Sequence, residues 1–149
     1  MSATGIPAFE STLQKTHIWL NDVMEVLGWE ERHKAYVALR VTLHALRDRL
    51  IVDEAVHLGA QLPMLMRGFY YEGWRPSAAP VKAHKAELLA QVADAFRTDP
   101  HVDPETIVRA IFTVLAKYIA AGEIADVKAL LPTDLAALWP RTRERGDRI

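Results

Sequence analysis

The chain aligns with itself when it is shifted by 69 residues. The segment Leu39–Tyr70 then falls on Val108–Trp139 without a gap, and apolar residues meet apolar residues at helical spacing. The polar matches and the Leu-Pro pairs are Arg40 with Arg109, Glu54 with Glu123, and Leu62-Pro63 with Leu131-Pro132. An internal repeat of this length restricts the architecture, because repeated units bury their apolar faces against one another. We therefore expect two copies of one structural unit.

Apolar residues recur every three or four positions along most of the chain, which predicts amphipathic helices. No segment alternates apolar and polar residues between turn signals, as a β-strand does. The predicted fold class is all-α, a helical bundle built from two tandem pseudo-repeats of long-long-short-short helices. The first unit should hold helices at about 9–27, 31–50, 53–61 and from Pro63 onwards, and the second at about 81–97, from Asp103-Pro104, and at about 122–130 and 132–139.

Local signals mark the ends of several of these helices. Gly28 stands where the first helix should stop, Asp53 is a candidate cap, and Asp103-Pro104 combines a cap residue with a proline at the first helical position. We expect a flexible arm at 1–8, a single helical domain at 9–140 and a polar tail at 141–149. Within the domain, units 9–74 and 81–140 are joined by a linker at 73–80 that contains two prolines and a glycine.

Composition excludes several classes of protein. Half of the 149 residues are hydrophobic, a quarter are charged and the net charge is −1, as in soluble globular domains without a global attraction to nucleic acid or anionic membrane. The absence of cysteine excludes disulfides, thiolate metal sites and a cysteine nucleophile. The first residues lack the pattern of a signal peptide, and no apolar run is long enough to span a membrane, so we expect a soluble cytoplasmic protein.

Three stretches resemble a bacterial family known as domain of unknown function 2267. They are KTHIWLNDVMEVLGW at 15–29, the run from HALRDRL at 44–50 through EAVHLGAQLP and RGFYYEGW at 54–74, and GEIADVKALLPTDLAALWP at 122–140. The resemblance implies a small helical bacterial protein. It implies no reaction, cofactor or catalytic residue.

The two units differ most in their last helix, which reads MLMRGFYYEGW at 64–74 and TDLAALWP at 133–140. Tyrosine, tryptophan and arginine are enriched in binding hot spots. The first interpretation is that this helix packs over the joint between the halves and its aromatic rings complete the core. The second is an exposed patch that binds a partner or a ligand, formed by Arg67, Tyr70, Tyr71, Glu72 and Trp74.

Two pairs of a histidine and an aspartate stand four residues apart, at His44 with Asp48 and at Asp53 with His57. On a helix such a pair lies on one face, where a carboxylate orients an imidazole for general base chemistry or forms an ordinary surface contact. A metal site would bring His44, Asp48 and His57 together. Spacing alone leaves these alternatives open.

Other signatures of chemistry are missing. The chain has no glycine-rich phosphate loop, dinucleotide fingerprint or nucleophile elbow, and no HExxH pair. We assign no catalytic residue and no cofactor. The arginines of the tail are offset by Glu144 and Asp147, which does not favour nucleic-acid binding.

Two hypotheses for the function follow. The first is a non-enzymatic helical module that acts through protein contacts, with a partner or with a second copy of the chain. The alternative is a protein that binds a small molecule or a metal in a pocket between the two repeats, lined by His44, His57 and the tyrosines.

Overall fold

The computed structural model describes residues 3–76 and 84–141, and within these ranges it contains helices and no strand. The all-α prediction is confirmed. The helices are α1 (Pro7–Leu27), α2 (Arg32–Arg47), α3 (Val52–Ala60), α4 (Met64–Tyr71), α5 (Lys85–Ala95), α6 (Pro104–Tyr118), α7 (Ala121–Ala129) and α8 (Thr133–Ala136).

Two predicted helix ends agree with the structure. Helix α1 ends before Gly28, which has a φ of 68°, the left-handed conformation that glycine adopts without steric cost. Helix α6 begins at Pro104, and the side chain of Asp103 accepts a hydrogen bond from the backbone N–H of Glu105. Each of these signals acts over a few residues, so each is readable from the chain.

Other boundaries differ from the prediction. Helix α1 begins at Pro7, within the expected arm of 1–8, because a proline at the first helical position sacrifices no hydrogen bond. Thr4 is fixed to this helix, since its N–H and Oγ1 both donate to Glu10 Oε1, at 2.8 and 2.7 Å. Asp53 lies inside the first turn of α3 instead of capping it, and Pro63 precedes α4.

Several helices are shorter than expected. Helix α2 ends at Arg47, α5 spans only Lys85–Ala95 and α8 only Thr133–Ala136. The linker is described only over 73–76, and the tail only at Arg141. The rest of both segments lies outside the described residues.

The two units can be compared helix by helix. Helices α3 and α7 both have 9 residues, and their bounds differ by the 69-residue period of the alignment. Helix α8 has 4 residues where α4 has 8. The tandem repeat stays a prediction.

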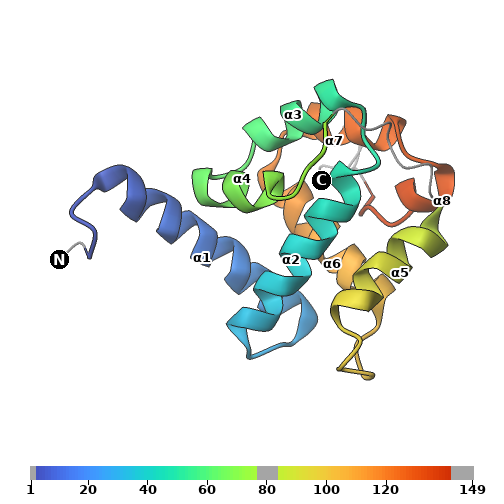
Figure 1. The fold of residues 1–149 in the computed structure, drawn as a ribbon, viewed down its shortest axis with the longest axis horizontal. Helices are drawn as coiled ribbons and strands as arrows, with labels where there is room; N and C mark the ends of the chain where they lie inside the picture. The colour runs from blue at the N-terminus through green and yellow to red at the C-terminus, as the bar shows by residue number, and fades with distance from the viewer. Residues whose placement is uncertain (1–2, 77–83, 142–149) are drawn as a thin grey trace, which may run out of the picture.

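Helices α2 and α6 lie at the centre of the bundle, and α1 and α5 each pack against both of them (Figure 1). Helices α3, α4 and α7 gather at one end, where α3 contacts both α4 and α7. Buried residues from both halves form one cluster, whose fully buried members include Leu39, Leu43, Leu46, Ile111, Phe112 and Leu115. Within the described ranges, none of the helices combines the length and apolar character that a membrane crossing requires.

Candidate functional site

The aromatic segment predicted as a binding patch is divided between core and surface. Tyr70 has no exposed surface, and its hydroxyl donates to the carbonyl of Ala55 at 2.7 Å. Burial raises the pKa of this phenol far above its usual value. Arg67 donates to the carbonyl of Gly59 in the last turn of α3 and to that of Leu62 just after the helix, at 3.0 and 2.9 Å. These two residues join α3 to α4, so the prediction that places Tyr70 on a surface patch is wrong.

The rest of the segment reaches the surface. The rings of Tyr71 and Trp74 stack with centroids 5.4 Å apart, and both residues are half-buried. Glu72 is exposed and pairs with Arg40 of α2 at 2.5 Å. Exposed ion pairs contribute little to stability, roughly 0–1 kcal/mol. Tyr71, Glu72 and Trp74 therefore remain candidates for contact with a partner.

His44 and Arg47 of α2 stabilise the C-terminal end of α4. His44 Nε2 lies 2.6 Å from the carbonyl oxygen of Phe69, and Arg47 donates to the carbonyls of Tyr70 and Glu72 at 2.7 and 3.0 Å. The last carbonyls of a helix have no partner within the helix, so these side chains satisfy them. Burial lowers the pKa of His44, which favours the neutral imidazole that donates from Nε2.

The spacing predicted that Asp48 contacts the imidazole of His44, but the two side chains do not pair. Asp48 accepts hydrogen bonds from its neighbour Arg47 instead, and Arg47 is 4% exposed. Asp48 directly follows the last residue of α2, so of the predicted pair His44 lies within the helix and Asp48 is its C-cap. The hydrogen bonds of His44 and Arg47 depend on the position of α4, which the residues of α2 do not indicate.

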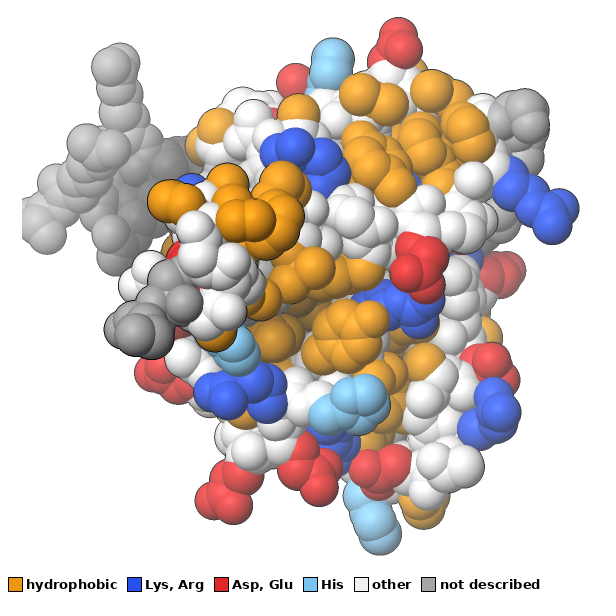
Figure 2. All heavy atoms as spheres, turned by 60° about the vertical axis from the view of Figure 1, so that its left-hand side comes forward, with side chains coloured by type: hydrophobic (Ala, Val, Ile, Leu, Met, Phe, Trp, Pro, Cys, Tyr) orange, Lys and Arg blue, Asp and Glu red, His pale blue; other side chains and the backbone are white. Residues whose placement is uncertain are grey.

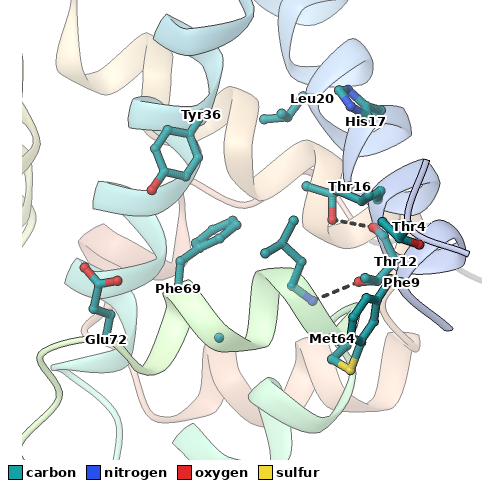
Figure 3. Close-up of a pocket in the computed structure, with 13 residues that line it drawn as sticks. Thr4, Phe9, Thr12, Thr16, His17, Leu20, Tyr36, Met64, Phe69 and Glu72 are labelled. Atoms are coloured by element: carbon teal, nitrogen blue, oxygen red, sulfur yellow. Dashed lines mark hydrogen bonds between the residues drawn. The ribbon is translucent and has the colours of Figure 1, made fainter. Parts of the chain in front are cut away.

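An open apolar groove of about 810 Å³ lies between α1, α2 and α4 (Figure 3). Large apolar side chains on its α1 and α4 walls are well exposed: Phe9 46%, Leu13 37%, Met64 47% and Leu65 42%. Figure 2 shows apolar side chains along a hollow on the face that turns forward from the left of Figure 1. Among the described residues, the lining comes from the first unit and from Thr4 of the predicted arm, and none of it from the second unit. The groove is therefore not the pocket between the repeats that the sequence predicted.

One hydrogen bond between α1 and α4 and one within α1 fix the shape of the groove. Thr12 Oγ1 accepts from the backbone N–H of Leu65 at 2.8 Å, which satisfies one of the first N–H groups of α4. Thr16 Oγ1 donates to the carbonyl of Thr12 at 2.7 Å (Figure 3). Gly68 lies on the lining, and a Cβ built there has no atom within 4 Å. The groove thus results from two rigidly connected helices and from a residue without a side chain.

A cluster of two carboxylates and one imidazole connects α3 with α7. One ligand atom from each of Glu54, His57 and Glu123 lies within 4.8 Å of the others. Desolvation, then the hydrogen bond and charge of Glu54, then the charge of Asp126, raise the pKa of Glu123 to about 7. Of the three predicted metal ligands, only His57 belongs to this cluster. His44 and Asp48 lie at the C-terminal end of α2, where His44 contacts α4.

The sequence of the chain also matches a family model. Residues 16–138 match the model of DUF2267, described as an uncharacterized conserved protein. The chain belongs to this family. The resemblance of 15–29, 44–74 and 122–140 is thereby confirmed at the level of the family. No curated protein matches the chain.

Two features of the site were missed by reasoning from the sequence. The groove needs α1 beside α4, and no pattern within either helix indicates that contact. The sequence contains one indication of the carboxylate pair, because Glu54 aligns with Glu123 in the repeat. That alignment did not show that the two side chains meet.

Proposed function

We propose that this protein is a helical interaction module that pairs with a second copy of itself through the groove between α1 and α4. The observation that supports the proposal is the open apolar groove with its exposed walls. Exposed large apolar residues that form a contiguous hollow are typical of interaction sites, whereas single exposed leucines are ordinary.

The apolar area suits a dimer interface. The groove residues Phe9, Leu13, Met64 and Leu65, with the adjacent Ile6, are 37–47% exposed. At about 200 Å² for a full side chain, they present roughly 400 Å² of apolar surface. A stable interface covers about 800 Å² on each partner, and somewhat more than half of that area is apolar. The groove therefore supplies about the apolar share of one standard interface.

The shape of α1 favours a second copy as the occupant. The N-terminal half of α1 extends from the bundle, so the same residues that form one wall of the groove also form a ridge (Figure 1). In a two-fold dimer each surface meets its own copy. The ridge of each α1 then lies in the groove of the other copy. The Phe9 side chains of both copies are thereby buried in the same interface.

Oligomeric state tests the proposal. We expect native mass spectrometry and light scattering over about 1–100 µM to show a dimer, since interfaces of this size bind in the micromolar range or tighter. Phe9→Glu should weaken the dimer at least about tenfold, because it places a charge in the apolar contact. Val26→Glu is the matched control, since Val26 lies on the same helix outside the groove lining and is 51% exposed.

Three results would contradict the proposal. A monomer at every concentration would exclude self-association. A dimer that Phe9→Glu and Val26→Glu affect equally would place the interface elsewhere. A monomer that retains a small molecule would support the alternative hypothesis of a ligand-binding protein. Circular dichroism of both variants should match the parent, because both residues are exposed.

A further inference from the structure

Helix α3 packs against α7 (Figure 1). Two glutamates, one from each helix, lie close together at this contact. Glu54 lies in the first turn of α3 and Glu123 in the first turn of α7. Glu54 is 9% exposed, and apart from the hydrogen bond that the two carboxyls make with each other, the Oε2 atoms of both glutamates are buried without a donor in the described part of the chain. Buried polar atoms in native proteins nearly always have a partner, so this pair calls for one.

Among the described residues, the basic side chain beside the two glutamates is the imidazole of His57. Its Nδ1 lies 3.7 Å from Glu54 Oε2, and its side chain is 68% exposed. Among the described residues, no lysine or arginine forms an ion pair with Glu54 or Glu123, and Asp126 adds negative charge nearby. The unpartnered Oε2 of Glu54, which points at His57, is thus aimed into the cluster.

We propose that Glu54, His57 and Glu123 bind a divalent transition-metal ion. Two carboxylates and an imidazole suit Zn²⁺ or Mn²⁺, whereas Ca²⁺ and Mg²⁺ prefer oxygen ligands alone. Ligands of one such ion lie about 2.0–2.2 Å from it, so two ligand atoms are at most about 4.4 Å apart. The ligand atoms here lie within 4.8 Å of one another, and small rotations of the side chains, above all of the exposed His57, close the difference.

The ion would connect the two halves of the chain. Glu54 and His57 belong to α3, Glu123 belongs to α7, and the two helices are 69 residues apart along the chain. Binding that requires both helices stabilises the folded state over the unfolded chain. This site is separate from the groove, so its test is independent of self-association.

Titration of the chelator-treated full chain with ZnCl₂ tests the proposal. We expect calorimetry to show one bound ion per chain and amide ¹H–¹⁵N signals of both α3 and α7 to shift. Glu123→Gln and His57→Ala should each weaken binding at least about tenfold, as loss of a ligand does. His84→Ala is the matched control, because His84 lies 3.8 Å from Asp134 in an exposed pair away from the cluster and should leave binding unchanged.

Every other outcome overturns the proposal. Absence of Zn²⁺ binding, with a higher melting temperature for Glu123→Gln, would show that a shared proton satisfies the two carboxylates. Binding that survives Glu123→Gln and shifts signals of α3 alone would show adventitious binding to a histidine. His57 is exposed, so His57→Ala should fold. It therefore tests the proposal even if Glu123→Gln does not fold.

Discussion

Two helical glycines should respond in opposite directions to the same substitution. Alanine in place of glycine inside a helix stabilises by about 0.5–1 kcal/mol, because glycine loses more backbone freedom on folding. At Gly68 of α4 an added Cβ meets no atom within 4 Å. Gly68→Ala should therefore raise the free energy of unfolding by about 0.5–1 kcal/mol.

At Gly59 of α3 the same Cβ collides with α4. It would lie 2.3 Å from Tyr71 Oη, 2.7 Å from Tyr71 Cζ and 3.0 Å from Tyr70 Cε2. Tyr70 is buried and bonded to Ala55, so Tyr71 has to move, by roughly 1 Å, and its stacking on Trp74 is disturbed. Overpacking costs about 1–3 kcal/mol, and with the helix-propensity gain subtracted, Gly59→Ala should destabilise by about 1–2 kcal/mol.

Urea unfolding followed by circular dichroism measures both variants, and a double-mutant cycle identifies the collision. Tyr71→Ala removes the two nearest atoms, so Gly59→Ala should cost about 1 kcal/mol less in that background. If Gly59→Ala stabilised as much as Gly68→Ala, the close approach of α3 and α4 would be wrong. If its cost were the same with and without Tyr71, Tyr71 would not be the residue that is displaced.

Three further predictions concern the core, the end of α4 and the carboxylate pair. Leu46→Ala and Leu115→Ala should each destabilise the protein by about 2–5 kcal/mol, since both side chains are fully buried. Calorimetry should show a single unfolding transition, and two transitions would contradict a core shared by the two halves. Arg47→Met should cost about 2–3 kcal/mol in urea unfolding, because it removes charged hydrogen bonds to carbonyls at the end of α4, and a cost near zero would exclude that role. In the presence of a chelator, the free energy of unfolding should fall as the pH rises from about 5 to 8. The pKa of Glu123 is about 7 in the folded chain and about 4.5 for an ordinary glutamate, so the folded chain keeps this proton at a pH where the unfolded chain has lost it. Glu123→Gln should flatten this dependence, and equal slopes in the two proteins would refute it.

The end of α4 shows how far residues alone can be interpreted. Spacing predicted that His44 and Asp48 share one face of a helix, and α2 does present His44 and Arg47 to one neighbour. The prediction of a carboxylate–imidazole pair was wrong because carbonyls of α4 compete for the imidazole and Arg47 takes the carboxylate. The carbonyls at the end of α4 are about 25 residues away in the chain and adjacent in space, whereas Arg47 is the neighbour of Asp48 in sequence.

The aromatic segment was ambiguous for the same reason. Tyr70 and Tyr71 are consecutive residues of one helix, yet one is fully buried and the other is half-buried beside Trp74. Helical periodicity states which residues share a face. It does not state which face meets α3, and that contact decides which ring belongs to the core.

Helix content and several helix ends are properties of the sequence itself, because periodicity and caps act within a few residues, as Gly28 and Asp103 illustrate. The alignment of Glu54 with Glu123 is also written in the chain. Only the tertiary structure places α1 beside α4 to open a groove, and α3 beside α7 to bring two carboxylates together. Both features depend on packing between helices distant in sequence, which is determined by the whole set of apolar faces at once and not by any one of them.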